Sequence, residues 1–172
     1  EAAKMVRVDY EELPAILSIE EAWESKQFTY EPPSIASGDA EAAVRAASHS
    51  VSGQVSCGGQ DHFYLETHIA LAVPGEDRDL KIYSSTQHPT EAQHGVSRIL
   101  GVPYSNVIIE VRRMGGGFGG KESQSTIIAG IAAVLSFITK KPVKLRLRRD
   151  ADMLATGKRH DFLYKYEVGF DE

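Results

Sequence analysis

Cysteine is nearly absent from this sequence, which has one, Cys57, among 172 residues. One thiol cannot close an intramolecular disulfide, and it cannot supply the roughly four thiolates of a structural zinc or iron–sulfur site. A lone cysteine is most often a small buried side chain, so we expect Cys57 to be buried.

Long apolar runs and an excess of positive charge are missing as well. No run of about 18 apolar residues exists, so no segment is expected to span a bilayer. The opening residues lack the apolar stretch of a secretory signal. Lys and Arg number 19 against 24 Asp and Glu, which gives a net charge of −5. Because nucleic acids and anionic membranes attract positive charge, we expect neither as a partner. We expect a globular protein of the cytoplasm.

Strand-like and helix-like segments alternate in the middle of the chain, whereas strands gather elsewhere. Alternation and short apolar runs predict strands near residues 5–10, 51–57, 69–73, 80–83, 107–111, 143–147 and 162–170. Apolar spacings of three and four, with capping residues, predict helices from Ser18, over 39–46, over 90–100 and over 127–138. This mixture predicts an α+β (mixed α/β) fold, with mixed sheets and packed helices.

Three details of this prediction concern burial and helix ends. The apolar run Val107–Val111 is typical of a strand buried on both faces. Thr90 is expected to cap the helix that Gly101 ends. The helix over 127–138 is expected to bury its large apolar side chains, which are Ile127, Ile128, Ile131, Leu135 and Ile138.

A glycine-rich loop, Gly115–Gly120 with Phe118 inside it, lies between a predicted strand and a predicted helix. Glycines there permit positive φ and let main-chain amides approach a ligand closely. Such amides, next to the start of a helix, suit anionic oxygens of a phosphate or of a metal-bound group. A glycine-rich turn that closes tightly over the sheet is the structural alternative.

Two nucleotide-binding patterns fit this loop only in part. Gly115, Gly117 and Gly120 satisfy G-x-G-x-x-G, but lysines stand where the ribose-binding acid is expected about 20 residues later. The same loop matches the first seven places of a P-loop, and Glu122 occupies the eighth, which needs Ser or Thr for magnesium. Both patterns fail at a position that carries chemistry.

A second segment, Gly58–Glu66, opens with two glycines and a neutral amide, then turns aromatic and apolar. The side chain of Gln60 can donate a hydrogen bond to an oxo or hydroxyl ligand without adding charge. The structural alternative is an amide that satisfies nearby main-chain groups.

Taken together, Gly58–Glu66 and Met114–Glu122 resemble the molybdenum subunit of the xanthine dehydrogenase family, which belongs to the molybdenum hydroxylases. The resemblance extends through Ser85–Pro89, Arg149–Met153 and Thr156–His160, and near Thr156 it is closest to the bacterial form. The opening of the chain is similar to the end of a small α/β hammerhead domain. With a linker predicted at Pro32 and Pro33, we expect residues 1–26 to end that hammerhead-type domain and 27–172 to begin the molybdenum-cofactor-binding domain.

The resemblance implies roles for four residues. Gln60 hydrogen-bonds an oxygen on molybdenum, and the main-chain amides of Phe118 and Gly119 face oxygens of the molybdopterin cofactor. Gln60 and Phe118 thus contact the oxygen ligands of the metal. Glu122 lies beside a purine substrate, where burial would favour its protonated form. Similar aldehyde oxidases generally lack this glutamate, so its presence favours a purine.

The implied activity is hydroxylation of hypoxanthine and xanthine to urate, with water as the oxygen source. Electrons pass to two [2Fe–2S] clusters and FAD on partner chains or domains. The resemblance places the catalytic base beyond Glu172, so this chain is expected to contain no catalytic residue and to be inactive alone. The alternatives are a related hydroxylase of aldehydes or other N-heterocycles, a non-catalytic nucleotide-binding module that uses the glycine loop, or a structural fragment.

Overall fold

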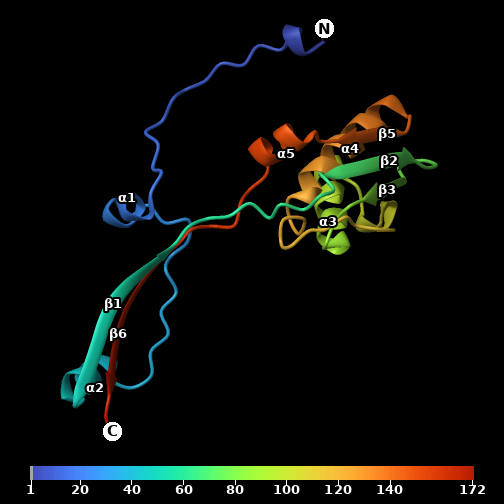
Figure 1. Cartoon of the computed structure of the whole chain (residues 1–172). Coiled ribbons are helices and arrows are strands. Elements are labelled where there is room, and N and C mark those ends of the chain that lie inside the picture. The colour runs from blue at the N-terminus through green and yellow to red at the C-terminus, as the bar shows by residue number, and fades with distance from the viewer. Residues whose placement is uncertain (1) are drawn as a thin grey trace. The chain divides into compact units, whose positions relative to one another are not determined.

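The computed structural model describes residues 2–172, and only Glu1, in the predicted hammerhead-type segment, lies outside this range. The chain forms two compact units (Figure 1). One comprises the chain up to Gly58 together with Asp161–Glu172, and the other comprises Gly59–His160. Over residues 2–172, every helix is too short or too polar to cross a membrane.

The first unit is built on a two-stranded antiparallel ribbon. Strand β1 (His49–Cys57) pairs with β6 (Phe162–Phe170) over nine residues each. The other elements of this unit are η1 (Ala2–Met5), α1 (Ile19–Glu24) and α2 (Ala40–Ala46). As predicted, Ser18 and Asp39 cap α1 and α2, accepting hydrogen bonds from the Glu21 and Ala42 amides.

Two expectations about this unit are wrong, and a third stays a prediction. The predicted strand over 5–10 is wrong, because no strand within residues 2–172 pairs with it and its apolar side chains are exposed. Cys57 is exposed at the last pair of the ribbon, not buried. The compact units divide at Gly58. The predicted boundary after residue 26 and the hammerhead assignment stay predictions.

The second unit contains a four-stranded mixed sheet in the order β4-β3-β2-β5. Its strands are β2 (Ile69–Pro74), β3 (Leu80–Ser84), β4 (Val107–Glu110) and β5 (Val143–Arg146). Strand β2 is antiparallel to β3 and β5, whereas β3 and β4 are parallel. The helical elements are α3 (Pro89–Leu100), η2 (Tyr104–Asn106), α4 (Ser125–Thr139) and α5 (Arg149–Ala155). The predicted α+β fold with a mixed sheet is confirmed.

Helices α3 and α4 pack together and cover one face of this sheet (Figure 1). The core between the layers consists of small and medium apolar side chains, including Ala70, Ile82, Val96, Val107 and Ala132. Helix α4 turns its small residues inward, and these are Ser125, Ala129, Gly130, Ala132, Ala133 and Ser136.

The expected burial of the large residues of α4 is therefore mostly wrong. Only Ile128 is buried, whereas Ile127, Ile131, Leu135 and Ile138 are exposed. The reason is close approach: a Cβ on Gly130 would lie 2.6 Å from Ile99 of α3, so only small residues fit between α4 and its neighbours.

Strand β4 lies at the edge of the sheet and not inside it. Ile108 is 56% exposed because the helices cover only one face, so burial on both faces is wrong. Helix α3 begins at Pro89, and its cap is His88, two residues before the predicted Thr90. Its predicted end is confirmed, since Gly101 adopts the left-handed conformation with φ of 64°.

Replacing Ile82 by alanine is expected to lower the free energy of unfolding of this unit by about 3 kcal/mol, because a fully buried side chain leaves a cavity. Ile108→Ala on the neighbouring strand removes the same atoms from an exposed site and should cost about 1 kcal/mol or less. Urea unfolding followed by circular dichroism at 222 nm measures both. Equal losses would contradict the assigned core.

Candidate functional site

The glycine loop runs from Gly115 to Gly120, between β4 and α4. Three of its residues have positive φ: Gly116 at 95°, Phe118 at 53° and Gly119 at 89°. For phenylalanine this conformation costs roughly 1–2 kcal/mol, and it persists only where the surroundings impose it. Phe118 is 75% exposed and Gly119 is exposed, whereas Gly117 and Gly120 are buried.

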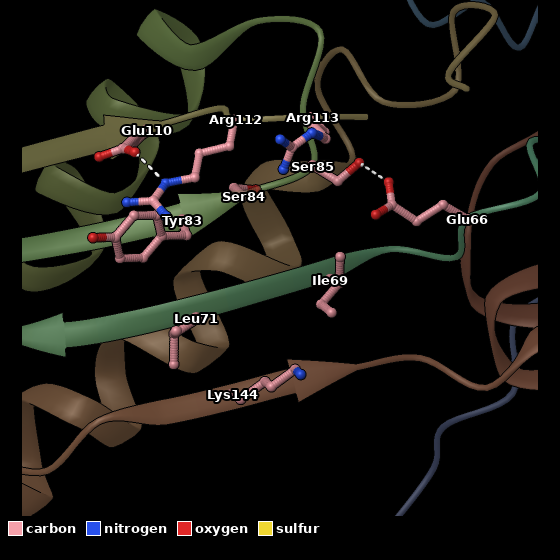
Figure 2. Close-up of a pocket in the computed structure, with 10 residues that line it drawn as sticks. All are labelled: Glu66, Ile69, Leu71, Tyr83, Ser84, Ser85, Glu110, Arg112, Arg113 and Lys144. Carbon is pink, nitrogen blue, oxygen red and sulfur yellow. Dashed lines mark hydrogen bonds and ion pairs between the residues drawn. The ribbon is translucent and has the colours of Figure 1, made fainter. Parts of the chain in front are cut away.

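Glu66 contacts both ends of the loop. At the first end, its Oε2 accepts from the Gly115 N–H at 2.9 Å, and its own N–H donates to the Gly115 carbonyl at 3.1 Å. Beyond the second end, the same Oε2 accepts from Lys121 Nζ at 3.1 Å. Ser85, just after β3, also donates to this oxygen, at 2.5 Å (Figure 2).

Gln87 contacts the middle of the loop. Its Oε1 accepts from the N–H groups of Gly119 at 3.0 Å and Lys121 at 3.2 Å. Its own N–H donates to the Lys121 carbonyl at 2.8 Å. A Cβ on Gly117 would lie 2.4 Å from Gln87 Oε1, so only glycine allows this approach.

The lysine that follows the loop is fully buried. Lys121 is 0% exposed, and its Nζ donates to Ser85 Oγ at 2.9 Å as well as to Glu66, 4.7 Å from the centre of the Tyr64 ring. Burial lowers the pKa of Lys121, and the Glu66 carboxylate opposes this. Burial also acts to raise the pKa of Glu66, but hydrogen bonds from Gly115, Ser85 and Lys121 hold it below its usual range. We conclude that Glu66 is ionised.

A second buried cluster joins Tyr64, His68 and Asp152. The Tyr64 hydroxyl donates to Asp152 Oδ1 at 2.7 Å and lies 2.9 Å from His68 Nδ1. The His68 N–H donates to Asp152 Oδ2 at 2.6 Å. Burial raises the pKa of Tyr64 to about 12 and lowers the pKa of His68. Burial acts to raise the pKa of Asp152, but hydrogen bonds led by the His68 N–H lower it overall. The cluster ties α5 to the segment before β2.

The structure brings the two sequence motifs together. Glu66 binds Gly115, and a Cβ on Gly120 would lie 2.7 Å from the Tyr64 ring and 2.8 Å from the ring of His62. The segment that contains Gln60 therefore continues directly beneath the glycine loop. The convergence of Gln60 with the Phe118 and Gly119 main chain stays a prediction.

The four predicted site residues occupy exposed positions. Gln60 exchanges main-chain hydrogen bonds with Arg159, at 3.1 and 2.9 Å, and its side chain is exposed. Phe118, Gly119 and Glu122 are exposed as well, and the Gly119 amide donates to Gln87. Their contacts with a cofactor or substrate stay predictions.

Sequence reasoning missed Glu66, Gln87 and Lys121 as the residues that hold the loop. The signal for Gln87 was available, since it lies in the Ser85–Pro89 segment that carried the resemblance. Lys121 could have been noticed as a charge directly after the glycine loop. At this position a lysine side chain must either fold back against the loop or extend into water. Glu66 gave no sign of its partners, which lie 49 and 55 positions away.

A separate pocket lies on the sheet face that the helices leave open (Figure 2). Its volume is about 150 Å³, and its walls include Tyr83, Glu110, Arg112, Arg113 and Lys144. Arg112 Nε donates to Glu110 at 2.6 Å, and its guanidinium lies 4.9 Å from the centre of the Tyr83 ring. Glu66 lines this pocket too, so the open face adjoins the residues that hold the loop.

A sequence profile of the molybdopterin cofactor-binding domain matches residues 22–172. The chain belongs to this family. Among relatives of this molybdopterin cofactor-binding chain, the xanthine dehydrogenase/oxidase of Mus musculus is 45% identical over 170 residues, 98% of this chain. The xanthine dehydrogenase of Emericella nidulans is 47% identical, also over 98%. The chain spans only 13% and 12% of the length of these two relatives.

Solved structures share the fold of the family. The aldehyde oxidoreductase from Desulfovibrio gigas superimposes with a TM-score of 0.83 and 26% identity, covering 98% of this chain and 19% of that one. Quinoline 2-oxidoreductase from Pseudomonas putida 86 gives 0.79 and 25%, covering 99% and 23%. The α+β arrangement described above is therefore that of known molybdopterin-binding folds.

The buried histidine predicts a pH dependence of stability. Because the pKa of folded His68 lies below its usual 6.5, only the unfolded chain takes up this proton as the pH falls below 6.5. The free energy of unfolding should then fall by up to about 1.4 kcal/mol per pH unit as the pH drops below 6.5, until the lowered pKa of folded His68 is reached. Urea titrations at several pH values measure this slope.

In this experiment His68→Gln should flatten the slope, and His160→Gln, an exposed histidine of the same unit, is the matched control. Below about pH 4.5, protonation of Glu66 and Asp152 adds a further loss, since the pKa of each is lowered in the folded state. An unchanged slope between pH 5 and 6.5 in His68→Gln would contradict the assignment.

Proposed function

We propose that this chain is part of the molybdenum-binding portion of a xanthine dehydrogenase that converts hypoxanthine and xanthine to urate. The observation that carries the proposal is the glycine loop, which Glu66, Gln87 and the buried Lys121 hold while Phe118 and Gly119 lie exposed. Identity of 45% and 47% to two xanthine dehydrogenases over 98% of the chain supports the choice of reaction.

The loop fits a cofactor rich in anionic oxygens. Phe118 and Gly119 have positive φ and are exposed residues, and the Phe118 N–H has no acceptor among residues 2–172. Gln87 adds a neutral amide beside them. We assign the cofactor contacts to Phe118, Gly119 and Gln60. The bound molybdopterin cofactor supplies oxidation of a carbon beside a ring nitrogen, with water as the source of oxygen.

The residues of this chain would bind and orient rather than transfer protons. Glu122 is exposed two residues after the loop, from which a carboxylate can accept from a purine ring N–H. When it is protonated, it can donate to a ring nitrogen or an exocyclic oxygen. The catalytic base is assigned to a part of the complete enzyme that follows this segment.

The remaining parts of the proposal concern partners. Electrons would leave through two [2Fe–2S] clusters to FAD, on other chains or domains of the complete enzyme. The cytoplasm is the proposed location. A related activity toward aldehydes is the second candidate, favoured by the structural similarity to an aldehyde oxidoreductase at a TM-score of 0.83.

A chimera tests the proposed function. Residues 1–172 replace the matching segment of the full-length Mus musculus relative, and bound molybdenum and urate formation from xanthine are measured. We expect stoichiometric molybdenum and xanthine turnover. A chimera that folds and contains molybdenum, yet turns over aldehydes and not xanthine, would contradict the purine assignment in favour of the second candidate.

Within this chimera, Glu122→Leu should lower kcat/KM for xanthine about 10- to 100-fold, because a polar partner of the purine is lost. Activity toward an aldehyde should be kept. Glu76→Leu, an exposed glutamate in the β2–β3 turn, is the matched control. Equal losses for both substrates would mean that Glu122 does not select the purine.

A further inference from the structure

We propose that Glu66 is a positioning residue, whose contacts with Gly115 and with the buried Lys121 fix the orientation of the glycine loop. The fixing itself follows from contacts within this chain. Only its consequence, correct presentation of the Phe118 amide and placement of Gly119 at the cofactor, rests on the proposed function.

The first step is geometric. A single oxygen of Glu66 accepts from the Gly115 N–H at 2.9 Å, from Lys121 Nζ at 3.1 Å and from Ser85 Oγ at 2.5 Å. The main-chain pair between Glu66 and Gly115 adds a fourth hydrogen bond, at 3.1 Å. Since Gly115 begins the loop and Lys121 follows it, one side chain sets the separation of the two ends.

The second step concerns charge. Lys121 is 0% exposed, and a buried ammonium requires a carboxylate partner. Glu66 is the only carboxylate within 4.0 Å of Lys121 Nζ among residues 2–172, and its side chain is 36% exposed. Hydrogen bonds to a charged acceptor are about twice as strong as neutral ones, so the carboxylate holds the loop more firmly than an amide would.

The third step connects this pair to the exposed site residues. The Lys121 N–H and the Gly119 N–H share one acceptor, Gln87 Oε1. A shift of Lys121 therefore changes the acceptor geometry of Gly119, and it also turns Glu122, the next residue. The position of the Lys121 side chain is thus transmitted through the main chain to the residues assigned to cofactor and substrate.

Amide hydrogen exchange, measured by NMR on the full cofactor-free chain, tests this inference. Glu66→Ala should speed exchange at Gly115 at least about tenfold, through loss of its acceptor. It should also speed exchange at Gly119 and Lys121, whose acceptor is Gln87 and not Glu66. Glu76→Gln is the matched control, and protection at Ile82 in β3 reports that the unit is still folded.

Exchange that is faster at Gly115 alone would overturn the inference, because Glu66 would then affect only its own partner. If Glu66→Ala unfolds the unit, the double variant Glu66→Gln with Lys121→Met replaces it, since no unpaired charge is left buried. Faster exchange at Gly119 in the folded double variant supports the inference, and parent-like exchange overturns it. The readout contains no cofactor, so failure of the proposed function leaves it unaffected.

The consequence for the cofactor has a separate spectroscopic test. In the molybdenum-loaded chimera, Glu66→Gln should change the g-values of the Mo(V) electron paramagnetic resonance signal, and Glu76→Gln should not. Unchanged g-values together with a disturbed loop would overturn the link to the cofactor, whereas a parent chimera without molybdenum would contradict the proposed function.

Discussion

The buried amino group of Lys121 is the constraint on which the rest of the site depends. A lysine side chain withdrawn from water must be surrounded by acceptors, and here Glu66, Ser85 and the Tyr64 ring surround it. These partners come from two segments far apart in the sequence. Because satisfying the lysine requires both segments, it also brings the loop after β4 against the chain before β2.

The sheet explains why these residues can meet. Strands β3 and β4 are parallel, so their carboxyl ends lie on the same side of the sheet, at the ends of the strands. Ser85 and Gln87 follow β3, and the glycine loop follows β4. In open α/β sheets ligands bind outside the carboxyl ends of such strands. Ser85 and Gln87, which follow β3, lie beside the loop at this carboxyl end of the strands. Helix α4 begins at Ser125, shortly after the loop in the chain.

Much of the fold could be predicted from local patterns. The alternation of apolar residues predicts β2, β3 and β5, and the apolar spacing predicts that α3 and α4 are helices. The failures concern partners that a local pattern cannot name. No strand pairs with the predicted strand over 5–10 within residues 2–172, and β4 is an edge strand. Helix α4 packs through its alanines because α3 and the sheet lie close to it.

In the site, too, local patterns mark single segments but do not identify their partners. The glycines and the resemblance of the two motifs marked the loop, because a missing Cβ is visible in a sequence. The ionic contact of Glu66 with Lys121 joins residues 55 positions apart, and although each lies in one of the two motifs, no local pattern pairs them. Gln60 illustrates the opposite case: its motif is recognisable, yet the structure gives it main-chain contacts with Arg159, and its side chain lies exposed.

The contacts of Glu66 and Gln87 fix the loop before any cofactor binds. Backbone order parameters from ¹⁵N relaxation on the cofactor-free chain measure this. We expect values for the amides of residues 115–121 near those of α4, about 0.85. Values below about 0.6 in this stretch, with α4 still rigid, would show that these contacts do not hold the loop.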